Sequence, residues 1–332
     1  MRRRDALIGA ASILISAPVL AQPKLKQHRI AFVHSAFPAE QLTEAAGPFW
    51  VRSFFEELRR SGYTEGQNLA VERYSALGDR LRHAQLAAEI AARNPALIVA
   101  NSNLLVDALR TATQTIPIVG VLGDPLSYGT VANLARPEGN VTGVSIDAGI
   151  QVNGKRLALL KQAIPSASRI AFLTLPADWD GAGGLDVRRA AERIGVTVVG
   201  SSPRDGSETA LRDVFVTALA DGVNGLAVSA SGEWLPRRET IVQLAREYRV
   251  PAMYPYRDFV EVGGLMAYTP DLRETATHLA DAVAQVLRGK HPRDIPIQQA
   301  TKFSLVLNLV AARELGTAVS AVVLAQANEV IE

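Results

Sequence analysis

The chain has 332 residues, with 35 Lys and Arg against 33 Asp and Glu, a formal net charge of +2. Apolar residues make up 48% of it and charged residues 20%, which excludes a disordered or low-complexity chain. The absence of cysteine excludes a disulfide scaffold, a thiolate metal site and a cysteine nucleophile. The small net charge gives no electrostatic basis for binding nucleic acid. Because the length exceeds what one hydrophobic core fills, two lobes of roughly 150 residues are expected.

The first residues have the three parts of an export signal. Arg2, Arg3 and Arg4 precede an apolar stretch from position 6 to 20, and small residues follow at the cleavage positions. The apolar stretch is shorter than the ~20 residues that span a bilayer as an anchor. We therefore predict a signal peptide over residues 1–21, cleaved after Ala21, and a mature protein in the periplasm. Without cysteine it is not a lipoprotein, and both the Sec and the Tat route stay open.

Downstream of the signal, short apolar strands alternate with amphipathic helices. Val51, Phe54, Phe55 and Leu58 follow the spacing of one helix face. Strands such as 96–100 are apolar on both faces, as in a parallel sheet covered by helices on each side. The predicted strands are 29–35, 69–74, 96–100, 116–122, 169–175, 196–200, 225–229, 251–254, 265–268 and 303–309. The predicted helices are 49–62, 83–93, 153–164, 184–194, 207–219, 238–248 and 273–287.

A short motif, basic-Ile-Ala-Phe, occurs at Arg29–Phe32 and again at Arg169–Phe172. Each copy opens a strand–helix series, so the fold class predicted is α/β, with two doubly wound, Rossmann-like lobes built on parallel sheets. Arg136–Ser145, which contains Pro and Gly, is expected to cross between the lobes. The N-terminal lobe is assigned residues 22–145 and 266–296, and the C-terminal lobe 146–265 and 297–332. The hinge candidates are 141–145, 263–265 and 297–301.

Several stretches occur in an order and spacing typical of one family. They are Gly62–Asn68, Ile116–Val119 with Gly123–Pro125, Arg136–Ser145, Gly154–Leu157, Tyr254–Phe259 with Gly263–Tyr268, and Thr301–Phe303. On these residues the chain resembles the substrate-binding proteins of ABC importers, and more narrowly their tryptophan- and tyrosine-binding members. The resemblance implies the type I periplasmic-binding fold and a monomeric protein that is not an enzyme. Such a protein closes over a small solute by a hinge motion and delivers it to ABC permease subunits in the inner membrane.

The motifs of other functions are missing. The sequence has no Gly-x-Ser-x-Gly elbow, no Walker loop and no metal-ligand spacing among its five histidines, which are expected at the surface. The glycine-rich stretch Gly181–Gly184 lacks the spacing of a dinucleotide loop. We therefore expect no cofactor and no metal. Pro176–Asp180 replaces an Asn/Pro-rich turn usual in the family, which leaves the identity of the ligand open.

Polar residues at predicted strand ends supply the ligand-site candidates of the N-terminal lobe. Ser35, Asn101, Ser102 and Asp124 each follow a predicted strand. The N–H groups of a helix that begins after Asn101 suit a ligand carboxylate, although Ser102 can also act as a simple N-cap. Asp124 either pairs with a ligand ammonium group or serves as a turn residue.

The candidates of the C-terminal lobe combine aromatic and charged side chains. Trp179 and Tyr254 are expected as aromatic walls, and Arg257 as a fork for a carboxylate. The remaining candidates are Asp178, Ser231, Glu233 and Tyr268.

The sequence is compatible with three functions. The importer-binding protein is favoured, with an amino acid as its solute, aromatic in particular, or another small carboxylate. A periplasmic sensor that presents its solute to a receptor has the same fold and cleft. An exported α/β enzyme is the third, and it predicts turnover of a substrate.

Overall fold

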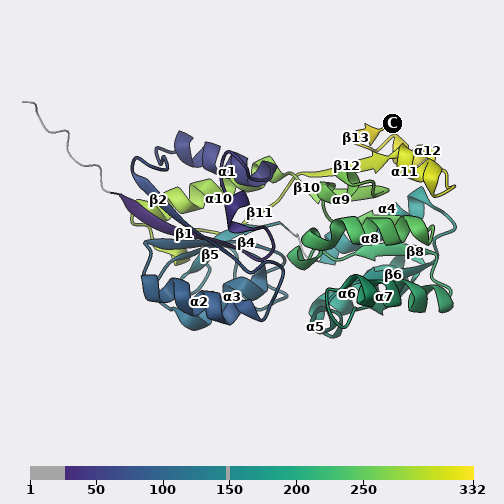
Figure 1. Cartoon of the computed structure of the whole chain (residues 1–332), viewed down its shortest axis with the longest axis horizontal. Helices are drawn as coiled ribbons and strands as arrows, with labels where there is room; N and C mark the ends of the chain where they lie inside the picture. Colours follow the sequence, from purple (N-terminus) through teal and green to yellow (C-terminus); the bar gives the residue numbers. More distant parts are fainter. Residues whose placement is uncertain (1–26, 147–149) are drawn as a thin grey trace, which may run out of the picture.

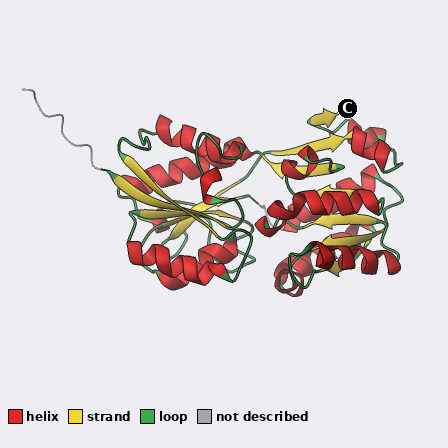
Figure 2. Cartoon of the chain, viewed as in Figure 1, coloured by secondary structure: helices red, strands yellow, loops and turns green. Residues whose placement is uncertain are grey.

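The computed structural model describes residues 27–146 and 150–332, and the predicted signal peptide lies outside these ranges. The described chain forms two α/β lobes that lie side by side (Figure 1). In each lobe a twisted sheet is covered by helices on both faces (Figure 2). Within the described residues, no helix is both long and apolar enough to cross a lipid bilayer.

The two sheets repeat one strand order. The order is β11-β5-β4-β3-β1-β2 in the N-terminal lobe and β13-β12-β10-β9-β8-β6-β7 in the C-terminal lobe. The N-terminal strands are β1 (His28–His34), β2 (Leu69–Ser75), β3 (Leu97–Asn101), β4 (Ile118–Leu122), β5 (Val141–Ser145) and β11 (Gln298–Gln299). The C-terminal strands are β6 (Arg169–Leu173), β7 (Thr197–Ser201), β8 (Gly225–Val228), β9 (Ala252–Tyr254), β10 (Met266–Pro270), β12 (Phe303–Asn308) and β13 (Glu329–Ile331).

The repeated motif marks equivalent strands. The copy at Arg29 lies in β1 and the copy at Arg169 in β6, each of which is the second strand from one edge of its sheet. Strand pairs are parallel in both sheets, except that β10 and β12 are antiparallel. The predicted fold class, two doubly wound lobes on parallel sheets, is therefore confirmed.

Helices cover each sheet because its strands are apolar on both faces. In the N-terminal lobe, α1 (Phe49–Arg60) and α10 (Leu272–Leu287) pack on one face with Phe32 and Val99. On the other face, α2 (Arg82–Arg93) and α3 (Asn103–Ala112) pack against Ala31 and Ile98. The C-terminal sheet has α7 (Glu208–Ala220), α8 (Arg238–Glu247) and α9 (Arg257–Glu261) on one face. Its other face carries α4 (Ile150–Ala163), α6 (Ala182–Ile194), α11 (Leu309–Glu314) and α12 (Ala321–Leu324).

Short helical turns complete the fold: η1 (Ala39–Gln41), α5 (Pro176–Asp180), η2 (Gly232–Arg237) and η3 (Pro292–Asp294). Of these, α5 occupies the stretch that the sequence suggested was a loop. It follows β6 and folds back onto α6.

The chain changes lobes after β5, after β10 and after β11. Backbone hydrogen bonds tie these crossings together, from Ala300 N to the Ser145 carbonyl (2.8 Å) and from Asp271 N to the Lys302 carbonyl (2.9 Å). The sequence assigned 266–270 to the N-terminal lobe, but β10 pairs with β9 and β12. It also assigned 297–299 to the C-terminal lobe, but β11 pairs with β5. Residues 141–145 form a buried strand, so the crossing begins beyond them.

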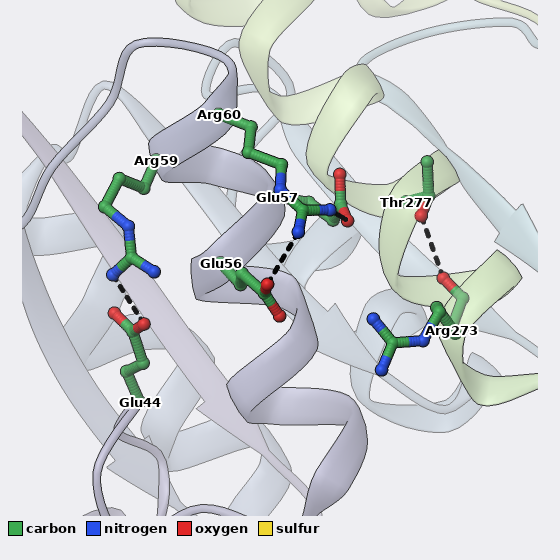
Figure 3. A network of polar contacts seen from close by, with 7 residues as sticks. All are labelled: Glu44, Glu56, Glu57, Arg59, Arg60, Arg273 and Thr277. Atoms are coloured by element: carbon green, nitrogen blue, oxygen red, sulfur yellow. Dashed lines mark hydrogen bonds and ion pairs between the residues drawn. The ribbon is translucent and has the colours of Figure 1, made fainter.

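Ion pairs on the outer surface of α1 contribute little to stability. Arg59 pairs with Glu44 at 2.6 Å, and Arg60 pairs with Glu56 at 2.7 Å and Glu57 at 2.6 Å (Figure 3). The two arginine side chains are at least half exposed, and exposed pairs are worth about 0–1 kcal/mol each. The lobes therefore depend on their apolar cores, as a chain without cysteine must.

Gly143 allows β5 to approach β4 closely. It pairs with Gly120, its φ is +142°, and a Cβ on it would lie 1.9 Å from the Gly120 carbonyl oxygen. A side chain there has no room and also strains the backbone.

Replacing Gly143 by alanine is expected to lower the free energy of unfolding by at least about 2 kcal/mol, because both backbone strain and a steric clash act. Gly129→Ala is the matched control: its φ is +68°, but no atom lies within 4 Å of an added Cβ. Urea unfolding of both variants measures the difference. Equal losses in the two variants would contradict the crowding at Gly143.

Candidate functional site

A cavity of about 110 Å³ lies between the lobes, at the carboxyl ends of the strands of both sheets. This volume is several times the ~10–15 Å³ that one water molecule needs. Its polar side chains come from the N-terminal lobe (Ser102, Asn103, Asp124, Ser127 and Tyr128) and the C-terminal lobe (Asn153, Thr174, Asp178, Asp186, Ser229 and Ser231). Because both lobes contribute, the site is complete only when they meet.

Two helices direct their N-termini at this cavity. Helix α3 begins at Asn103, after an N-cap Ser102 whose hydroxyl accepts from Leu105 N at 3.4 Å. Helix α6 begins just before Gly183 and Gly184, which line the cavity, and has no side-chain cap. The unpaired N–H groups and positive dipole end of each helix favour a ligand carboxylate.

Gly184 has a structural role as well. A Cβ at this position would lie 1.9 Å from the Trp179 carbonyl oxygen, so α5 packs directly on the start of α6. This packing accounts for a glycine at position 184 without a dinucleotide site.

The backbone of Ser102 is in an unusual conformation, with φ +70° and ψ 144°. Such a conformation costs a non-glycine residue about 1–3 kcal/mol, and strain of this kind gathers at functional sites. The Ser102 N–H donates to the Val121 carbonyl at 2.8 Å, which holds the turn from β3 into α3. The strained turn sets where the N-terminus of α3 points.

Three aspartates, Asp124, Asp178 and Asp186, line the cavity. Asp186 is 8% exposed and makes no hydrogen bond or ion pair with any described residue. Burial raises the pKa of Asp178, opposed by a hydrogen bond with Tyr128 and by the charge of Arg80, both from the other lobe. A cavity lined by aspartates, with no Lys or Arg in its described lining, suits a ligand that carries a positive charge.

A second compartment of about 90 Å³ adjoins the first and shares Ser102, Gly123, Ala230 and Gly232 with it. We call it the aromatic compartment, because the rings of His34, Phe37, Trp50 and Tyr256 line it. The interlobe cleft thus has a polar, acidic part and an aromatic part that lie next to each other.

The lobes touch at the rim of the cleft. Arg80 of the N-terminal lobe pairs with Glu233 of the C-terminal lobe at 3.2 Å. A Cβ on Gly232 would lie 3.0 Å from Ser35 Oγ, and one on Gly78 would lie 3.2 Å from Arg237 Nη1. The structure is therefore a closed form.

Most of the N-terminal candidates lie where the sequence placed them. Ser102 and Asp124 line the cavity, and Asn101 lines the aromatic compartment. Ser35 N donates to Asn101 Oδ1 at 2.7 Å, and Asn101 Nδ2 donates to Ser35 Oγ at 3.0 Å, directly below Gly232. The Asp124 carboxylate accepts from Ser127 Oγ at 2.6 Å and from two backbone N–H groups, so it serves its own turn.

In the C-terminal lobe, Asp178 lines the cavity and Glu233 lies at the rim, whereas Trp179 lies outside the cleft. Its ring covers Gly200, where a Cβ would come within 2.2 Å of it, and the Arg188 guanidinium stacks on it at 4.6 Å. The ring also packs against the core of the lobe. The reason is that α5 folds back over β7 instead of extending into the cleft.

Three further candidates also lie away from the cavity. Tyr254 is 1% exposed and stacks on Phe259, with ring centroids 4.9 Å apart. Arg257 pairs with Glu329 at 2.7 Å on the outer surface of the lobe, and it also contacts Glu261. The ring of Tyr268 stacks on the ring of Phe303, with centroids 5.3 Å apart.

Several lining residues were not predicted. Ser127 and Tyr128 lie a few residues beyond Gly123–Pro125, the strand end that the sequence had singled out, so a wider window would have included them. Asp186 lies inside a helix, and because charged residues are common in helices, nothing in the sequence selected it as a site residue. His34 and His83, expected at the surface, are only 2% and 6% exposed. Across ranges 27–146 and 150–332, no cluster of three His, Asp or Glu side chains is arranged to hold a metal ion.

Comparison with known proteins agrees with this architecture. The profile of the family described as "ABC transporter substrate binding protein" matches residues 49–331. The tyrosine-binding protein of Clostridioides difficile (strain R20291) is 24% identical over 259 residues, which cover 77% of this chain and 73% of that protein. A conserved domain protein of Vibrio cholerae superposes with a TM-score of 0.80 and 24% identity, over 92% of this chain and 100% of that one. An ABC domain from Streptococcus pneumoniae in complex with L-Trp gives 0.80 and 23%, with the same coverage.

The fold, with two doubly wound lobes and a cleft between them, is the type I periplasmic-binding fold. More narrowly, the chain belongs to the ABC transporter substrate-binding protein family, as the match over most of its length shows. This is a family of binding proteins and not of enzymes, which agrees with the resemblance seen in the sequence.

Glu233 makes the stability of this closed form depend on pH. Burial raises its pKa from 4.5 to about 7, although Arg80 and Arg237 oppose the rise; Asp178 and Asp79 add to it. Between these two pH values the folded state holds a proton that the unfolded state has lost, so the free energy of unfolding falls as pH rises.

Glu233→Gln removes this titration. Between pH 5 and pH 8 the wild type is expected to lose about 1–3 kcal/mol of stability relative to the variant. Chemical unfolding of both proteins at the two pH values measures the effect. A stability difference that is the same at both pH values would contradict the burial of a titrating Glu233.

Proposed function

We propose that this protein is the extracytoplasmic solute-binding component of an ABC importer and that its solute is an amino acid. The observation that carries the proposal is the acidic lining of the cavity, in which Asp186 has no partner among the described residues, together with the two helix N-termini that face the same cavity. A zwitterion satisfies both parts: its ammonium group pairs with the carboxylate, and its carboxylate accepts from the helix N–H groups.

In this proposal each group of the amino acid has its own partners. Asp186 and Asp178 receive the ammonium group, while Ser102 and Asn103 at the start of α3 receive the carboxylate. The helix N-termini take the role that the sequence gave to Arg257. The relatives named above for tyrosine and for L-Trp support an amino acid as the class of solute.

Closure follows from the same arrangement. A ligand that contacts both lobes binds the closed form more tightly than the open form, and this difference shifts the population toward closure. The Arg80–Glu233 pair and the contacts of Gly232 form only when the lobes meet. The closed protein, a monomer in the periplasm, then delivers its solute to permease subunits in the inner membrane.

Deletion of the gene is expected to abolish uptake of the solute, whereas deletion of a sensor would abolish only the response to the solute.

A test of the solute class uses Asp186→Asn. Calorimetric titration of residues 22–332 with L-Tyr, L-Trp, L-Phe and L-Leu is expected to find at least one amino acid that binds. The variant should bind it about 10–100-fold more weakly, because an amide does not neutralise the ammonium group.

Asp213→Asn, at an exposed aspartate of α7, is the matched control and should bind like the wild type. The analogue of the bound amino acid without its amino group should bind weakly to the wild type and lose no further affinity in Asp186→Asn. Unchanged affinity of the amino acid for Asp186→Asn would contradict the proposed ammonium site.

A further inference from the structure

His34 is the last residue of β1, and backbone hydrogen bonds fix the protonation state of one of its ring nitrogens. Its Nδ1 accepts from the N–H groups of Ala36 and Phe37, both at 2.9 Å. A nitrogen that accepts hydrogen bonds carries no proton, so in the neutral ring the proton is on Nε2. Burial lowers the pKa of His34 to about 3, so the ring stays neutral at the pH of the periplasm.

The other edge of this ring is unused. Nε2 makes no hydrogen bond with any described residue, and His34 lines the aromatic compartment. The ring packs between Phe37 and Trp50, with centroid distances of 4.8 Å and 5.7 Å. An N–H donor at an apolar wall with no partner favours a ligand that brings an acceptor.

Other polar groups of the compartment already have partners. Tyr256 donates its hydroxyl to the Ala230 carbonyl at 2.7 Å, and Thr275 donates to the Asp271 carbonyl at 2.9 Å. The Asn101 amide is bonded to Ser35. Asp258 supplies one carboxyl group, whose pKa burial raises. A hydroxyl group both accepts and donates, so it suits a compartment with one unused N–H and one carboxyl group.

We propose that the aromatic compartment holds the side chain of the bound amino acid and that the Nε2–H of His34 selects a ring that carries a hydroxyl group. This proposal rests on the proposed function, because the compartment adjoins, and shares four lining residues with, the cavity that takes the amino and carboxylate groups. A phenyl ring leaves the donor unpaired, and an indole N–H offers a second donor to it. A site built around a hydrogen bond discriminates against analogues that lack the partner group.

Two substitutions at His34 separate the donor from the packing. His34→Asn keeps a side-chain acceptor close to the backbone, where Ala36 and Phe37 donate, but does not reach the compartment. His34→Gln places its amide N–H near the position of Nε2 and keeps a donor there.

The experiment measures the dissociation constants of L-Tyr, L-Phe and L-Leu by calorimetric titration. The wild type is expected to bind L-Tyr at least about 10-fold more tightly than L-Phe, a difference of ~1.4 kcal/mol. In His34→Asn this ratio should fall to near one, and in His34→Gln part of it should return. His278→Asn, in α10 and outside both compartments, should keep the wild-type ratio.

The outcomes distinguish the two proposals. A Tyr-to-Phe ratio that is the same in the wild type and His34→Asn, or tighter binding of L-Leu than of both aromatic amino acids, would overturn the role of His34 but leave the amino-acid site standing. Failure of the wild type to bind any amino acid would overturn both. Thermal unfolding of each variant shows whether it is folded. Because two ligands are compared on the same variant, a smaller fraction of active protein does not change the ratio of their dissociation constants.

Discussion

The meeting of two sheet edges is the constraint on which the rest of this structure depends. Parallel strands gather their carboxyl ends, and the loops that follow them, at one edge of each sheet. Three crossings of the chain bring these edges face to face, so Ser102 of one lobe and Asp178 of the other line one cavity. Neither lobe holds the site alone. Each lobe is held by its own apolar core, because the chain contains no cysteine.

The cleft collects negative charge that the protein does not fully neutralise. Arg80 lies near Glu233 and Asp178, but burial still raises the pKa of both acids, so the cost of desolvation exceeds the attraction. Asp186 has no partner among the described residues. A bound ammonium group would offset the cost of burying these acids when the lobes come together, which couples ligand binding to closure. The acidic lining and the aromatic compartment thus fit the two ends of one ligand, its ammonium group and its aromatic side chain.

The fold could be predicted from the sequence because buried parallel strands are apolar on both faces, and the repeated motif marked β1 and β6. The site could be predicted only in part. Ser102 and Asp178 follow strand ends, and the topology of the two sheets brings those strand ends to the cleft. Trp179 could not be placed, because the return of α5 over Gly200 is a tertiary contact without a local signal. Asp186 and His34 were missed since a charged residue in a helix and an isolated histidine both usually lie at the surface.

A crystal structure of the protein with the amino acid that it binds most tightly tests the central claim most directly. The account predicts the amino group within hydrogen-bonding distance of the Asp186 carboxylate, the ligand carboxylate at the N-terminus of α3, and the side chain in the aromatic compartment. A ligand bound outside the interlobe cleft, or one bound with its amino group away from both Asp186 and Asp178, would contradict it.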